Sequence, residues 1–151
     1  MTGLASFAEA ERDLLVRLPR WIVAAASAVQ PDNAVRTHRE MEAGFLAVAN
    51  GRLSGDRFLT EVANGTLDIF DEEGPVATAE VDGVLEKAGS AWQLVRARVS
   101  SDEAAAYARW LLDITDEVIS AARSDGVLGV GGLLISPAEQ RFRDRLAQIL
   151  A

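Results

Sequence analysis

The sequence has no cysteine, a single histidine (His38) and a single lysine among its 151 residues. The absence of cysteine excludes disulfide bonds, a thiol nucleophile and every cysteine-ligated zinc or iron–sulfur site. One histidine is also too few for a metal site built on several imidazoles. The longest apolar segments, residues 21–29 and 127–135, are far shorter than the ~20 residues of a membrane-spanning helix. Any metal bound by this protein must therefore accept oxygen ligands.

Basic residues are also few relative to acidic ones, at 15 against 23, which gives a formal net charge of −8. Nucleic-acid phosphates and anionic bilayers repel such a chain, so we expect neither nucleic acid nor direct membrane insertion. The first residues lack the basic and apolar regions of a targeting segment. We therefore expect a cytoplasmic protein whose small ligands are cations.

Hydrophobic residues make up 49% of the chain, which suffices for the core of one domain spanning residues 1–151. They recur at three- and four-residue spacing, which is typical of helices, whereas the alternation typical of strands is nearly absent. We expect an all-α fold, a compact bundle of five to seven helices. Asn64 and Gly65 are predicted to end a short helix over 56–63, with an acidic loop over 66–75 after it.

Two parts of the chain follow the same order of signals. An alanine-rich helix is predicted to end at Asp32, and Thr37 and Glu40 then have the spacing of a capping box that opens the next helix. The same order recurs when a helix ends at Asp125 and a second capping box spans residues 136–139. The sequence therefore predicts two related helix–Asp-loop–helix hairpins, the second with a glycine-rich loop over 126–135. That loop is either a packed lid or a flap that docks a partner.

The second copy, residues 121–126 with residues 135–139, resembles the TerB-like helical domains associated with tellurite resistance. Those domains carry an Ala-x-Ala-Asp-Gly-x-(Ile/Val)-(Ser/Thr)-x-x-Glu pattern, and Asp32, Thr37 and Glu40 match it more loosely in the first copy. Asn33 stands where the family pattern has glycine, and residues 127–134 lengthen the second loop. The resemblance implies an all-α fold without enzymatic activity, a role in metal-linked stress response, divalent-cation binding and association with larger complexes.

The matched positions hold four candidate metal ligands, namely Asp32, Glu40, Asp125 and Glu139. Two related hairpins would bring these carboxylates together around Ca²⁺ or Mg²⁺, hard cations that prefer oxygen ligands. The simpler interpretation is that each aspartate is a turn residue and each glutamate completes a capping box. Both interpretations account for the sequence.

A second acidic group, Asp113, Asp116 and Glu117, lies on one predicted helix and either extends a metal site, attracts a basic partner or forms a solvated face. His38 has no neighbouring nucleophile in the sequence, so we expect a surface role for it and no enzymatic activity. Two functions follow as hypotheses. The first is a non-enzymatic TerB-like protein that binds a divalent cation. The alternative is an all-α protein-interaction module or homodimer without a metal.

Overall fold

A computed structural model describes residues 3–29, 34–76, 79–123 and 136–151, without the side chains of 34–36 and 122–123. In these ranges the protein is all-helical, as the sequence predicted, and no strand is present. The described elements are two short 3-10 helices, η1 (Leu4–Ser6) and η2 (Gly51–Leu53), and the helices α1 (Glu9–Ala28), α2 (Ala34–Asn50), α3 (Arg57–Glu73), α4 (Val81–Arg98), α5 (Ser101–Arg123) and α6 (Pro137–Ile149).

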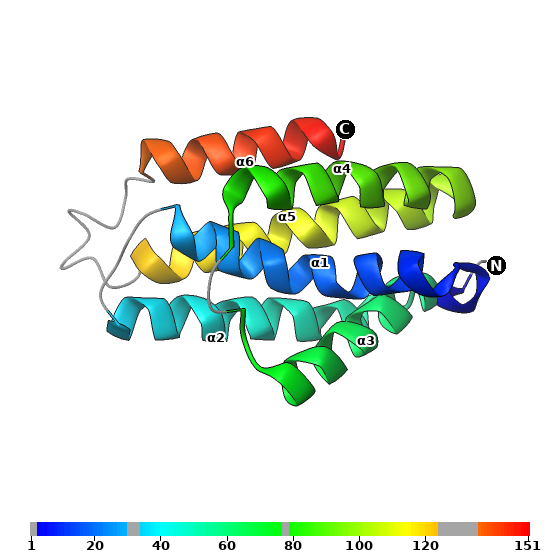
Figure 1. The fold of residues 1–151 in the computed structure, drawn as a ribbon, viewed down its shortest axis with the longest axis horizontal. Coiled ribbons are helices and arrows are strands. Elements are labelled where there is room, and N and C mark those ends of the chain that lie inside the picture. Colours follow the sequence, from blue (N-terminus) through cyan, green and yellow to red (C-terminus); the bar gives the residue numbers. More distant parts are fainter. Residues whose placement is uncertain (1–2, 30–33, 77–78, 124–135) are drawn as a thin grey trace.

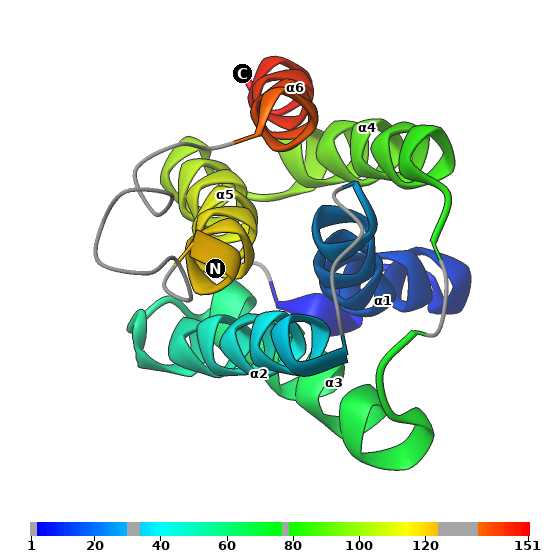
Figure 2. The ribbon, with the colours of Figure 1, turned by 90° about the vertical axis from the view of Figure 1, so that its left-hand side faces the viewer.

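The helices form a bundle in which α1 lies at the centre (Figures 1 and 2). Helix α1 packs against α2, α3, α4 and α5, while α2 makes its most extensive contact with α5. Helix α6 covers α4 and α5 at one edge. At the left-hand end in Figure 1, α1 and α5 end and α2 and α6 begin. Glu40 of α2 and Glu139 of α6, two of the candidate metal ligands, lie in the first two turns of these helices.

Pro19 does not divide the first helix, because α1 is continuous from Glu9 to Ala28. The core beside α1 contains a row of four aromatic rings. Their centroids follow one another at distances of 5.8, 5.8 and 6.1 Å, in the order Phe7, Phe58, Tyr107 and Trp110. Burial raises the pKa of the Tyr107 phenol. This row connects the residue that follows η1 with α3 and α5, so the end of the bundle opposite the candidate site is fixed by large apolar contacts.

Helix α3 corrects the prediction of a helix stop at residues 64–65 and an acidic loop after it. The helix runs through both residues to Glu73. Gly65 does not end the helix but allows a close contact with α1, because a β-carbon at this position would come within 2.7 Å of Val16 Cγ1. The next residue, Thr66, is buried and its hydroxyl donates to the Val16 carbonyl at 2.7 Å. The acidic residues of the predicted loop, Asp68, Asp71, Glu72 and Glu73, instead lie on the exposed face of this helix.

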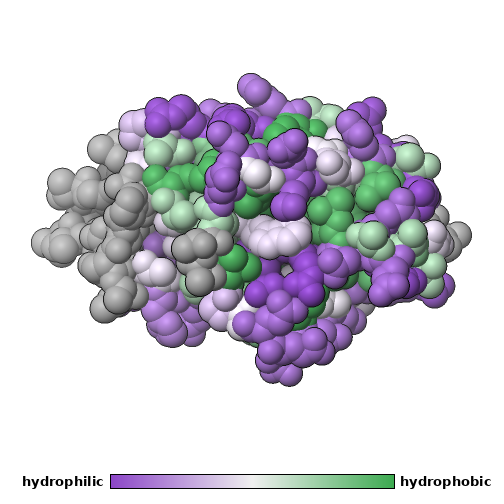
Figure 3. All heavy atoms as spheres, in the orientation of Figure 1, coloured by the Kyte–Doolittle hydropathy of each residue, from purple (hydrophilic) through white to green (hydrophobic). Residues whose placement is uncertain are grey.

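On the face drawn in Figure 3, hydrophilic side chains lie between several separate apolar areas. In the part of the chain that the structure describes, each helix is too short or too polar to cross a bilayer.

Candidate functional site

Of the four predicted metal ligands, Glu40 and Glu139 belong to the part of the protein that the structure describes. Asp32 and Asp125 lie outside the described residues, as does the predicted glycine-rich loop over 126–135. The structure therefore locates the second ligand of each predicted hairpin and leaves the first one as a prediction.

Glu40 occupies the second turn of α2 and its side chain is 0% exposed. The predicted capping box is wrong here, because α2 begins at Ala34 and Thr37 already lies inside the helix. Glu40 shares its helix face with Gly44, four residues later, which is packed against Val23 of α1. Its carboxylate is therefore on the core face of α2, and the start of the helix does not account for it.

Glu139 lies in the first turn of α6, where the predicted capping box is confirmed. The backbone N–H of Glu139 donates to Ser136 Oγ at 3.1 Å, and the Ser136 N–H donates to Glu139 Oε1 at 3.0 Å. The side chain is 4% exposed, and its second oxygen, Oε2, is buried without a hydrogen-bond partner among the described residues. One oxygen of this carboxylate thus serves the helix, and the other is buried without a hydrogen bond.

The corresponding glutamate at the start of α5 provides a comparison. Glu103 forms the same reciprocal bonds with Ser100, at 3.1 and 3.2 Å, but its side chain remains partly exposed. Helix α5 begins at the opposite end of the bundle (Figure 1). Capping alone therefore does not require burial, and the burial of Glu139 is a feature of its own end of the molecule.

Glu40 and Glu139 belong to helices that begin at the same end of the bundle, with α5 in contact with both helices. In the described residues, no three acidic or histidine side chains form a group that could hold a metal ion. Helices α2 and α6 are not among the helix pairs in extensive contact, and Figure 2 shows them on opposite sides of α1 and α5, so the two glutamates alone do not form a cation site.

The other predicted candidates are either exposed or paired with a different residue. Asp116 pairs with Arg143 of α6, whose Nε donates to Asp116 Oδ1 at 3.0 Å, and this hydrogen bond raises the pKa of the guanidinium. Asp113 and Glu117 are exposed on α5. His38 is exposed, as predicted.

One cavity was missed by sequence reasoning. Trp92 and Arg96 line it from α4, four residues apart on one helix face, and Arg109 lines it from α5. The four-residue spacing was a usable signal for the first pair. The sequence does not show that α5 brings a second arginine to the same cavity, because this depends on how the helices pack.

Comparison with family models, with curated proteins and with solved structures gives no match for this chain.

Proposed function

We propose that this protein is a non-enzymatic, TerB-like helical domain that binds one divalent cation, Ca²⁺ or Mg²⁺, between its two hairpins. Glu40 and Glu139 supply buried carboxylate oxygens, and Asp32 and Asp125 supply the remaining carboxylates from the connections that precede α2 and α6. In this proposal the bound cation links the protein to metal or tellurite stress.

The observation that carries the proposal is the complete burial of Glu40 at a position where helix capping does not require a glutamate. An ionised carboxylate removed from water loses several kcal/mol of hydration (roughly, after relaxation), so burial needs compensation by a cation, a proton or hydrogen bonds. We propose that a divalent cation supplies part of this compensation beside the contacts that Glu40 makes within the protein, and the net charge of −8 agrees with cation binding. The second buried carboxylate, Glu139, supports the same interpretation because its Oε2 atom faces no donor among the described residues.

The chemistry of the donors favours a hard cation. The sequence offers no thiolate, and its one imidazole, His38, is exposed on the helix that carries Glu40. Carboxylate oxygens without sulfur or nitrogen donors suit Ca²⁺, which takes six to eight oxygens, or Mg²⁺, which keeps part of its water shell. Zinc and copper would lack their preferred ligands here.

Calorimetric titration of the metal-free protein with CaCl₂ and with MgCl₂ tests this function. We expect one binding event for at least one of the two ions, and a melting temperature that rises with ion concentration because the ligand binds the folded state. At a concentration ~100-fold above the dissociation constant, the folded state should gain about 2.7 kcal/mol. The double variant Glu40→Gln with Glu139→Gln should lose both signals.

Glu103→Gln is the matched control, because it removes a capping glutamate with the same hydrogen bonds at the opposite end of the bundle. It should lower stability slightly and leave the cation response intact. The proposed function is wrong if neither ion gives heat or a thermal shift, or if the double Gln variant binds as tightly as the unchanged protein.

The alternative function, an interaction module or homodimer, is favoured by a different observation. Three large apolar side chains within residues 45–53 are exposed, namely Phe45 (42%), Leu46 (57%) and Leu53 (83%). If two copies pair through them, light scattering should give twice the monomer mass, and Leu46→Asp with Leu53→Asp should restore the monomer. A monomeric mass for the unchanged protein over the micromolar range would contradict this function.

A further inference from the structure

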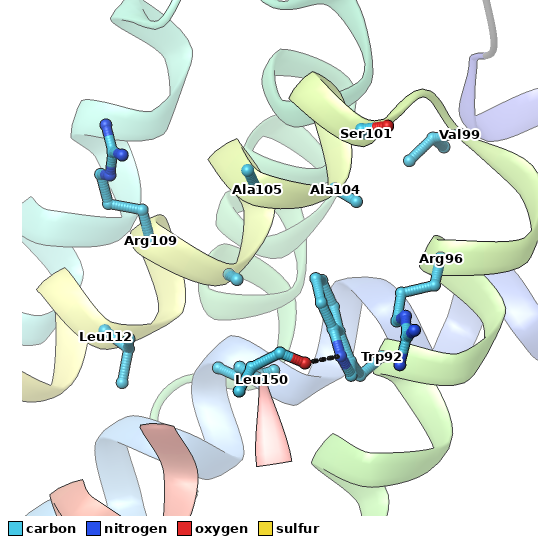
Figure 4. Close-up of a pocket in the computed structure, with 11 residues that line it drawn as sticks. Trp92, Arg96, Val99, Ser101, Ala104, Ala105, Arg109, Leu112 and Leu150 are labelled. Carbon is cyan, nitrogen blue, oxygen red and sulfur yellow. Dashed lines mark hydrogen bonds between the residues drawn. The ribbon is translucent and has the colours of Figure 1, made fainter. Parts of the chain in front are cut away.

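A cavity of about 560 Å³ lies between α4, α5 and the last residues of the chain (Figure 4). Its volume lies within the range of small-molecule sites in proteins, roughly 300–1,000 Å³. Most of its lining is apolar. Trp92, Leu150, Ala104 and Ala108 are buried at its floor, and Val99, Ala105 and Leu112 extend it toward the surface.

The ionisable side chains around this cavity are cationic, and its other polar groups are the Ser101 hydroxyl and the Ala151 main-chain oxygen that accepts from Trp92 Nε1. Arg96 lies beside Trp92, with its guanidinium carbon 5.8 Å from the ring centroid, and Arg109 lies on the α5 side (Figure 4). Neither arginine forms an ion pair with a described residue, and both side chains are exposed. No lining residue has an acidic side chain, although acidic residues exceed basic ones by 23 to 15 in the whole sequence.

Two other cavities contain acidic side chains beside an arginine. The cavity beside Phe45 and Phe70 includes Asp68 and Asp71 with Arg52, and the cavity beside Trp110 includes Asp113 and Glu117 with Arg109, which lines both this cavity and the one at Trp92. The cavity at Trp92 thus combines an apolar floor with two arginines and no acidic side chain. This combination selects a ligand that has an apolar chain and a negatively charged end.

We propose that the cavity between α4 and α5 binds an amphipathic carboxylate of the fatty-acid class. The acyl chain lies along Trp92, Leu150 and the alanines of α5, and the carboxylate accepts hydrogen bonds from Arg96 or Arg109. The hydrogen bond from Trp92 Nε1 to the carbonyl oxygen of Ala151, at 3.3 Å, fixes the indole as one wall of the site. This site is separate from the proposed cation site, because it uses none of the same residues.

Dodecanoate below its micellar concentration is the probe, and calorimetry in EDTA excludes any contribution from the cation site. We expect binding of one molecule per chain, with a change in tryptophan fluorescence. The variant Arg96→Gln with Arg109→Gln should bind about tenfold more weakly, as expected for the loss of two exposed charged contacts. Binding of the neutral analogue dodecanol should be the same for this variant and the unchanged protein.

Two further variants make the result independent of folding defects. Arg12→Gln with Arg141→Gln removes the same charge elsewhere on the surface and should leave dodecanoate binding unchanged. Ala105→Phe adds a large side chain at an exposed lining position and should abolish binding while the melting temperature is kept.

The proposal is overturned if dodecanoate does not bind, or if dodecanol binds equally well and the arginine variant has no effect. It is also overturned in favour of peptide docking if an acidic amphipathic helix binds this cavity and dodecanoate does not compete with it.

Discussion

Replacing Gly44 with alanine is expected to lower the free energy of unfolding by about 2 kcal/mol, a typical cost of overpacking where two helices are in close contact. Gly44 lies where α2 meets α1 and α5, and a β-carbon there would stand 2.6 Å from Val23 Cγ1 and 3.1 Å from Val118 Cγ2. Both valines are buried and β-branched, so neither can rotate away easily. The clash should outweigh the preference of a helix for alanine, which is worth about 1 kcal/mol.

Gly89→Ala in α4 is the matched control for this prediction. It is also a glycine inside a helix, but the nearest atom to its added β-carbon is Ile149 Cγ2 at 3.9 Å, an ordinary contact distance. We expect this variant to be more stable than the unchanged protein by about 0.5–1 kcal/mol. Denaturant unfolding of both variants measures the difference, and equal effects of the same sign would show that α2 can move away from α1 and α5.

The parts of the fold that the sequence predicted well are those fixed by local chemistry. Ser136 begins a helix through hydrogen bonds to Glu139, three residues later, and Asp56 accepts from the Leu59 N–H at the start of α3. These bonds join neighbours in the sequence, so the pattern contains all the information needed. The predicted stop at Gly65 failed because that glycine serves a contact between α3 and α1, which no local pattern records.

The candidate site was only partly predictable for the same reason. The sequence selected Glu40 and Glu139 from their spacing to a threonine and a serine, and the structure places one of the two in a capping box. The burial of Glu40 depends on the face that α2 presents to α1 and α5. The cavity at Trp92 depends likewise on contacts among α4, α5 and α6, which join residues more than ten positions apart.

Replacing Arg20 with methionine is expected to lower the free energy of unfolding by about 2 kcal/mol, the typical value of a hydrogen bond from a charged donor. Arg20 is buried in α1, and its Nε and Nη2 atoms donate to the Gly74 carbonyl at 3.1 and 2.8 Å. Gly74 ends α3 with a φ of +72°, and the guanidinium also lies over the Phe70 ring. Methionine keeps much of the volume, so denaturant unfolding would measure mainly the loss of these polar contacts.

Arg17→Met tests whether burial decides the size of this effect. Arg17 lies one turn earlier in α1 and donates to Glu73 and Asp13, both at the surface, so its loss should change stability by less than about 1 kcal/mol. The hydrogen bond from Arg17 holds the pKa of Glu73 below its ordinary value, so this contribution is present at neutral pH and disappears as Glu73 is protonated.

As the pH falls below the ordinary Glu73 pKa of 4.5, the effect of Arg17→Met should therefore decline. The effect of Arg20→Met should persist over the same range, because its principal acceptor, the Gly74 carbonyl, does not titrate. Glu73 Oε1 lies 3.7 Å from Arg20 Nη1. If the effects of the two variants on stability decline together, Arg20 stabilises the α1–α3 contact through the charge of Glu73 and not through the Gly74 carbonyl.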